Sequence, residues 1–298
     1  MKQFFTILSV SICLLSCSED AVEANFKDVT NTFIPAATDY SEEAEIRRTF
    51  YAEHGSYILF NDTLQHIALG RDANGNMQYF TELLDITYEV GASTTSNNKY
   101  SFTLIPTIEK KKQAVEYLES YILPHISGKL SPFSWFIADK ITREYIGKLS
   151  TPYAVTGQRA IIVATSILPQ LSDAQKVQYT RQIMNTIIGK LASDNADAFG
   201  EFAAISSAYY NGTFTEPSTN AENSVYLAKA GFICRGLDEL KTEQNGRYPS
   251  LDLDIQAYAR LIAVNTKEDV MTKYADYPLV LKKYEIAYRI LTSLGYKE

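Results

Sequence analysis

The sequence predicts a single α+β domain, with a mixed or antiparallel sheet in its N-terminal half and a mostly helical C-terminal half. Strand-like runs occur mainly before Leu171, and helical periodicity dominates after it. Such segregation favours an α+β fold over a regular βαβ array. Hydrophobic residues make up 46% of the 298 positions, which excludes a wholly disordered chain. The sequence contains no internal repeat, and no linker rich in Pro, Gly or Ser separates its halves.

Residues 1–16 have the pattern of a secretory leader. A single Lys2 precedes the mostly apolar run Phe4–Leu15, which is shorter than the roughly 20 residues that span a bilayer. The run ends in Leu14-Leu15-Ser16-Cys17, which resembles the bacterial lipobox, in which the cysteine is lipidated before the leader is cut. We therefore predict a lipoprotein held on a membrane through acyl chains on Cys17. The alternative is an ordinary signal peptide that is cut elsewhere, with Cys17 incidental.

The residues behind Cys17 indicate where the protein resides. Ser18-Glu19-Asp20 follows directly, and acidic residues at this place resemble the surface-export signal of lipoproteins in the phylum that includes the gut bacteroides. We expect an outer-membrane lipoprotein that faces the cell exterior, with the periplasmic face as the alternative. Residues 17–38 show no clear period, so we predict a flexible tether there and the folded domain at residues 39–298.

Helix and strand signals alternate through the first half of the domain. Runs rich in aromatic and β-branched residues predict strands, and apolar residues that recur every three or four positions predict helices. Pro124 stands where the second helix should stop. These patterns predict helices over Tyr40–Glu53 and Pro106–Leu123, and extended segments over Tyr57–Phe60, Met77–Val90, Trp135–Ala138 and Ala160–Ala164.

The second half is predicted to be helical. Ser172-Asp173-Ala174-Gln175 has the spacing of a capping box, in which the Ser and Gln side chains satisfy free N–H groups at a helix start. An apolar stripe follows it through Ile183, Ile187 and Leu191. Further helices are predicted over Ala198–Tyr210, Ala221–Ala230, Leu253–Val264 and Pro278–Leu294, with a short one capped by Thr266-Lys267-Glu268-Asp269.

Charge and motif content argue against several functions. The formal net charge is −7 and the one dense basic run is Lys110-Lys111-Lys112, so no nucleic-acid partner is expected. The sequence has no glycine-rich phosphate loop and no Gly-x-Ser-x-Gly elbow. His54, His66 and His125 do not pair at helical spacing and have no Cys nearby, so spacing predicts no zinc site and favours surface or capping roles. Cys234 is expected to be a buried apolar residue.

The order of short segments in the second half resembles a known family. Phe202-Ala203-Ala204-Ile205-Ser206 comes first, Ala228-Lys229-Ala230-Gly231-Phe232-Ile233 follows, and an acidic helix covers Asp252–Ala259. This order resembles the zinc metallopeptidase lipoproteins of the bacteroides phylum, which are associated with nutrient-import loci and carry a His-Glu-x-x-His helix. The resemblance implies a zincin-like domain over most of the mature chain.

The zinc motif itself is missing. Counting back from Phe202 places Thr186 and Lys190 at the two histidine positions and Ile187 at the glutamate. Thr is a poor zinc ligand, Ile cannot accept a proton, and a cationic Lys repels a divalent ion. The resemblance therefore implies a degenerate form without catalytic residues, zinc or another cofactor. A chain with no zinc-binding ancestor would show the same helix, with Ile187 simply facing the core.

We expect a non-catalytic, metallopeptidase-like accessory or binding protein of an outer-membrane nutrient-import complex. A retained cleft can bind a peptide or a glycan without a metal. The import role follows from the resemblance alone. Two alternatives stay open: an active hydrolase, either a metallopeptidase with displaced ligands or a carboxylate-based enzyme, and a structural or partner-binding lipoprotein. Zinc is expected only if the interpretation as a pseudoenzyme is wrong.

Overall fold

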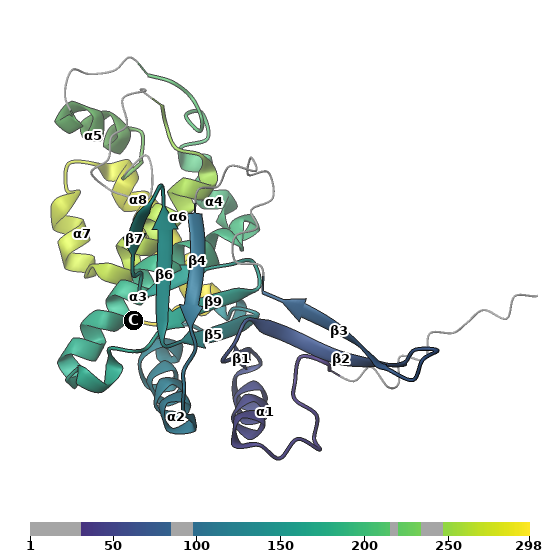
Figure 1. Cartoon of the computed structure of the whole chain (residues 1–298). Helices are drawn as coiled ribbons and strands as arrows, with labels where there is room; N and C mark the ends of the chain where they lie inside the picture. The colour runs from purple at the N-terminus through teal and green to yellow at the C-terminus, as the bar shows by residue number, and fades with distance from the viewer. Residues whose placement is uncertain (1–30, 85–97, 215–219, 234–246) are drawn as a thin grey trace, which may run out of the picture. The chain divides into compact units, whose positions relative to one another are not determined.

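The structure is a computed structural model that describes residues 31–84, 98–214, 220–233 and 247–298 (Figure 1). The chain divides into two units, Met1–Asn31 and Thr32–Glu298, and the second contains every helix and strand given below. The predicted leader, Cys17 and Cys234 lie outside the described residues. None of the helices in the described ranges combines the length and the hydropathy of a membrane span.

The described residues form an α+β fold with mixed sheets, which confirms the predicted class. In the central sheet, three strands run parallel and the fourth, at one edge, is antiparallel to its neighbour. Their order across the sheet is β1 (Tyr57–Leu59), β5 (Ser134–Ala138), β9 (Ala160–Ala164) and β8 (Ala154–Thr156). Three of these strands begin within the predicted segments or one residue before them.

Both faces of the central sheet are covered. Successive side chains of a strand point to opposite faces. Trp135 and Ile137 accordingly belong to the larger hydrophobic core, which the helices complete, whereas Phe136 and Ala138 belong to a smaller core on the other face. All residues of β5 and β9 are buried, because layers pack on both sides of them.

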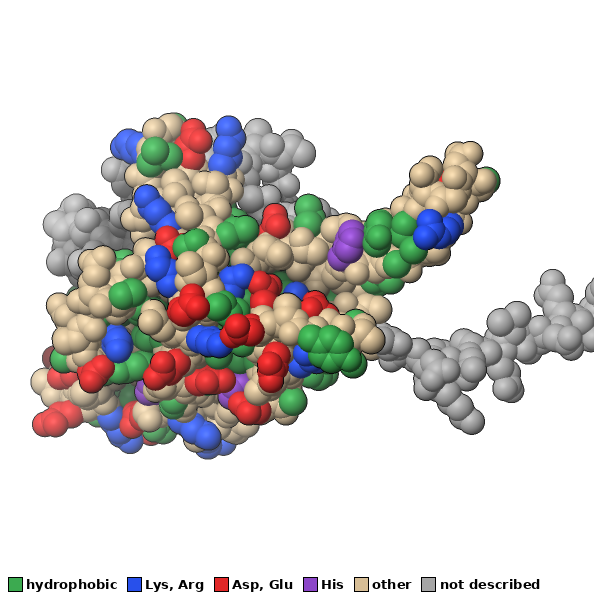
Figure 2. Space-filling view, turned by 60° about the horizontal axis from the view of Figure 1, so that its bottom comes forward, with side chains coloured by type: hydrophobic (Ala, Val, Ile, Leu, Met, Phe, Trp, Pro, Cys, Tyr) green, Lys and Arg blue, Asp and Glu red, His purple; other side chains and the backbone are tan. Residues whose placement is uncertain are grey.

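Two smaller antiparallel sheets come from the N-terminal half. One is the hairpin of β2 (Thr63–Arg71) and β3 (Met77–Leu83), and in the other β6 (Lys140–Tyr145) lies between β4 (Asn98–Thr103) and β7 (Lys148–Ser150). Hydrophobic side chains are exposed along the hairpin, as Figure 2 shows. The extended segment predicted over Met77–Val90 begins as β3, and its residues from 85 on lie outside the described ranges.

The two helices of the first half lie side by side. α1 (Glu42–His54) begins at the N-cap Ser41 and ends at Gly55, whose φ of 66° is the left-handed conformation that glycine adopts at low cost. α2 (Ile108–Tyr117) continues as a π-helix, η2 (Leu118–Ile122), and then as a 3₁₀ turn, η3 (Leu123–His125). The predicted helices are therefore present, and the end of the second is wound differently.

The second half is helical, as predicted. α3 (Asp173–Ser193) begins with the predicted capping box at Ser172 and Gln175. The later helices are η6 (Ala196–Phe199), α4 (Gly200–Ile205), α5 (Asn220–Lys229), α6 (Leu251–Val264), α7 (Lys267–Lys273) and α8 (Pro278–Leu294).

The helix predicted over Ala198–Tyr210 is correct in its first part and wrong in its second. The end of η6 and all of α4 are helical, and α4 ends at Ile205. Tight turns follow, and Asn211 takes a left-handed φ of 58° directly before Gly212. The Asn-Gly pair therefore favours a turn over a further helical segment.

The segment before α1 contacts the domain. The ring of Phe33 lies 5.4 Å from the rings of Tyr57 and Phe133, measured between centroids, and Arg48 donates a hydrogen bond of 2.9 Å to the carbonyl of Ala36. Part of residues 32–38, which the sequence places in the tether, thus packs on the start of β1.

Candidate functional site

The positions that the resemblance assigns to the zinc motif lie on α3 without ligand chemistry. The Thr186 hydroxyl donates a hydrogen bond of 3.0 Å to the carbonyl of Gln182, inside its own helix. Lys190 forms an ion pair with Asp194, one turn further on. Ile187 is fully buried in the larger core. The apolar stripe of α3 therefore faces the core, and Ile187 has no contact with solvent.

This stretch of α3 packs closely against α6. A Cβ atom at Gly189 would lie 3.1 Å from both Arg260 Nε and Gln256 Cβ, a distance tighter than ordinary van der Waals contact. Glycine therefore allows the close approach of the two helices here. The region around residues 186–190 is a helix–helix contact.

A groove of about 720 Å³ lies elsewhere, along the first half of α3. Its walls are η2, η3, α3, the end of α6, the start of α7 and the C-terminal residues. Its volume is within the range of roughly 300–1,000 Å³ that small-ligand sites occupy. Met184, Ile262 and Tyr296 line it and are buried, so its floor is largely apolar.

The rim of this groove carries charge. Arg181 is exposed, and it forms no hydrogen bond or ion pair with any described residue. Lys267 also lines the groove but is paired with Glu285 at 2.7 Å. Asp269 and Glu298 contribute carboxylates. The guanidinium of Arg181 is thus available to an anionic group of a ligand.

The π-helix η2 connects this groove to a second one of about 720 Å³. Ser120 and Tyr121 line both. The Tyr121 ring stacks on Tyr117 with 5.3 Å between centroids, and its hydroxyl donates a hydrogen bond of 3.0 Å to Asp173. Because π-helical turns are rare and occur frequently at functional sites, the position of η2 between the two grooves favours a binding role.

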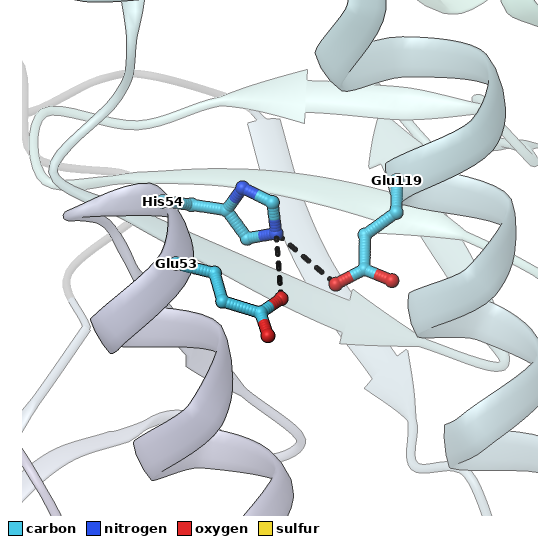
Figure 3. A group of neighbouring side chains, drawn as sticks. All are labelled: Glu53, His54 and Glu119. Atoms are coloured by element: carbon cyan, nitrogen blue, oxygen red, sulfur yellow. Dashed lines mark hydrogen bonds and ion pairs between the residues drawn. The ribbon is translucent and has the colours of Figure 1, made fainter.

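The three histidines have separate environments. His66 stacks on Tyr79 in the hairpin, with 4.5 Å between ring centroids. His125 Nδ1 donates a hydrogen bond of 3.1 Å to the carbonyl of Lys297. His54 lies at the end of α1 with its Nε2 atom 3.1 Å from Glu119 Oε1 and 3.9 Å from Glu53 Oε2 (Figure 3). His54 and Glu119 are 65 positions apart, so residue spacing could not predict this contact.

A buried ion pair joins α6 to α8. Lys283 Nζ donates hydrogen bonds to Asp254 Oδ2 and, at 3.2 Å, to Ser206 Oγ, and it lies 4.2 Å from the centroid of the Phe202 ring. The Tyr210 hydroxyl donates to the same Asp254 oxygen at 2.8 Å. Burial raises the pKa of the Asp254 carboxyl to about 6 and lowers the pKa of Lys283. Both side chains are at most 1% exposed, so the pair acts in packing.

Comparison of the chain with protein-family models, with curated proteins and with solved structures finds no match.

Proposed function

We propose that the chain is an outer-membrane lipoprotein, anchored through Cys17 and facing the cell exterior, whose zincin-like domain binds a peptide or a glycan without hydrolysing it. The protein serves as an accessory of a nutrient-import complex. The anchor and the import role rest on the lipobox-like segment and on the family resemblance. The binding role rests on the geometry of the domain.

The groove beside α3 is the observation that carries the binding role. It combines an apolar floor, a volume suited to a small ligand and the guanidinium of Arg181, which has no partner among the described residues. A guanidinium binds carboxylates through two parallel hydrogen bonds. The favoured ligand is therefore an anion with an apolar part, such as a peptide that bears a free carboxylate or an acidic oligosaccharide.

The chemistry of α3 supports the non-catalytic part of the proposal. Catalytic zinc in this kind of helix needs two imidazoles one turn apart and a carboxylate that takes a proton from bound water. Thr186 and Lys190 have no imidazole. Ile187 has no carboxylate and is enclosed by the core. The zincin-like fold is supported by a mixed sheet whose last strand, β9, is followed along the chain by α3, with residues 165–172 and their 3₁₀ turn η5 (Leu168–Gln170) between them.

Ligand binding to the purified full chain in detergent tests the proposal. Acidic peptides and acidic oligosaccharides are titrated by calorimetry into the wild type, Arg181→Ala and the control Arg71→Ala. Loss of a charge-assisted hydrogen bond, worth about 1.5–3 kcal/mol, predicts affinity weaker by about tenfold or more for Arg181→Ala. Arg71→Ala changes a hairpin arginine that does not line the groove and is expected to bind like the wild type.

Two results would contradict the proposal. One is equal affinity of the wild type and Arg181→Ala for every ligand that binds. The other is chelator-sensitive hydrolysis of a bound peptide, which would favour a hydrolase with displaced metal ligands. Cys17→Ala tests the anchor separately: the domain is expected to stay folded but to leave the membrane fraction, and variant protein that stays with membranes would contradict lipidation at Cys17.

A further inference from the structure

Three metal-ligating side chains meet where the end of α1 lies against η2. Figure 3 shows His54 directed toward two carboxylates, that of Glu53 on its own helix and that of Glu119 on η2. One ligand atom from each side chain lies within 4.8 Å of the others. This is the one such group of three that the described residues contain.

The distances suit an ion after a small movement. Zinc lies about 2.0–2.2 Å from imidazole nitrogen and carboxylate oxygen, so two ligands of a tetrahedral ion are roughly 3.4 Å apart. His54 Nε2 is 3.1 Å from Glu119 Oε1 and 3.9 Å from Glu53 Oε2, which brackets that value. The Glu53 side chain is 59% exposed, so a rotation about its own bonds can close the set.

Within the described ranges, the two carboxylates have no source of positive charge other than His54. No Lys or Arg in the part of the chain that the structure describes pairs with Glu53 or Glu119. Lys112, which lies nearby, is paired with Glu42 instead. The imidazole of His54 therefore faces two carboxylates, and a divalent cation placed between the three side chains would balance the carboxylate charge.

An ion can reach this place from solvent. A groove of about 410 Å³ opens beside α1 and η2 and is lined by Glu53 and Glu119, with the further carboxylates Glu42 and Glu45. Figure 2 shows acidic side chains gathered, among basic ones, on the face that α1 and α2 form. The acidic lining attracts cations, and the groove leaves room for water or a ligand oxygen to complete the coordination.

We propose that Glu53, His54 and Glu119 form a binding site for a divalent transition-metal ion, Zn²⁺ or Mn²⁺, that ties the end of α1 to the π-helix η2. The imidazole favours transition metals over Ca²⁺ and Mg²⁺, whereas the carboxylates suit both Zn²⁺ and Mn²⁺. The site is separate from α3 and from the groove beside Arg181, so the inference does not rest on the proposed function.

Metal titration of the chelator-treated full chain tests the site. Calorimetry with Zn²⁺, and separately with Mn²⁺, is expected to show one ion bound per chain for at least one of the two metals. Glu119→Gln keeps the shape of the side chain but removes a charged ligand. It should weaken binding at least about tenfold, because changing even an outer-shell partner of a metal ligand typically costs about 10–100-fold in affinity. The matched control is Glu45→Gln, which removes the same charge from the same groove outside the ligand set and should bind within about twofold of the wild type.

A second ligand variant keeps the test decisive if Glu119→Gln does not fold. Glu53→Gln changes an exposed residue that forms an ion pair with His54, and it should also weaken metal binding. The proposal would be overturned if the wild type bound neither Zn²⁺ nor Mn²⁺ at one ion per chain. Equal weakening by Glu45→Gln and the two ligand variants would also overturn it, because the groove would then attract cations only through its overall charge.

Discussion

Residues 186–190 of α3 and the junction of α1 with η2 differ in how metal-binding chemistry relates to the sequence. On α3 the resemblance assigns a zinc motif by position, yet Thr186 and Lys190 bond within the helix and Ile187 is buried. At the junction no motif exists, yet His54 and Glu119 meet from positions far apart in the chain. Helical spacing in a sequence therefore detects sites built on one element and misses sites assembled by the fold.

Introducing the glutamate of the His-Glu-x-x-His motif at residue 187 of α3 should cause the largest loss of stability. Ile187→Glu buries a carboxylate without a partner, and we expect a loss of about 5 kcal/mol or more in the free energy of unfolding. Ile187→Ala, which only leaves a cavity, should lose about 2–5 kcal/mol. Urea denaturation measures both. A folded Ile187→Glu with nearly wild-type stability would contradict the burial of Ile187, because this face of α3 would then be open to a site.

The buried pair of Asp254 and Lys283 is a second assembled cluster, one enclosed by the core. Lys283→Met leaves a buried carboxylate with one hydrogen bond from Tyr210, so we expect a loss of about 3–5 kcal/mol in unfolding free energy. The double variant Asp254→Leu with Lys283→Met should recover most of that loss. Metal content should not differ between wild type and double variant. A metal lost together with this pair would place the site here instead of at His54.

A substitution at the α3–α6 contact is expected to lower the unfolding free energy less. Gly189→Ala puts a methyl group 3.1 Å from Arg260 Nε and Gln256 Cβ, so the helices must separate slightly, at a cost of about 1–3 kcal/mol. Thermal or urea unfolding would detect this. Stability equal to or above that of the wild type would show that the two helices have space between them.

The junction should contribute little stability without metal. His54 and Glu119 are partly exposed. Glu119→Gln in metal-free protein should therefore lower the unfolding free energy by about 0.2–1 kcal/mol. Added Zn²⁺ or Mn²⁺ should stabilise the wild type and not the variant, because an ion that binds the folded state shifts the equilibrium toward it. Equal stabilisation of both proteins would contradict the site.

The smallest effect is expected at Lys190. Its pair with Asp194 lies on the helix surface, so Lys190→Ala should cost about 0.3–0.5 kcal/mol in unfolding free energy. Salt should reduce this difference further. A loss of several kcal/mol would reveal a structural role at this position that its exposed ion pair does not explain.

Local signals predicted much of the fold. The capping box at Ser172, the apolar stripe of α3 and Pro278 at the start of α8 act within one or two turns, so the sequence alone reveals them. The strands β2, β4, β6 and β7 lack buried apolar runs, so the sequence does not predict them. Their pairing depends on partners elsewhere in the chain.

The candidate sites were harder to predict for the same reason. The π-helical winding of η2 has no local sequence signal, and neither does the lack of a partner for Arg181 in the part of the chain that the structure describes. The grooves form only when α3 packs against η2 and the C-terminal residues. The sequence alone predicts that α3 lacks a zinc motif, because that prediction needs only the chemistry of Thr186, Ile187 and Lys190.

Anomalous diffraction from crystals of the full chain, prepared with one equivalent of whichever of Zn²⁺ and Mn²⁺ binds in calorimetry, distinguishes the junction of α1 with η2 from α3. We expect an anomalous peak between His54 Nε2 and the carboxylates of Glu53 and Glu119, and no peak beside Thr186 or Lys190. A peak on α3, or a bound ion with no peak at His54, would contradict the proposed site.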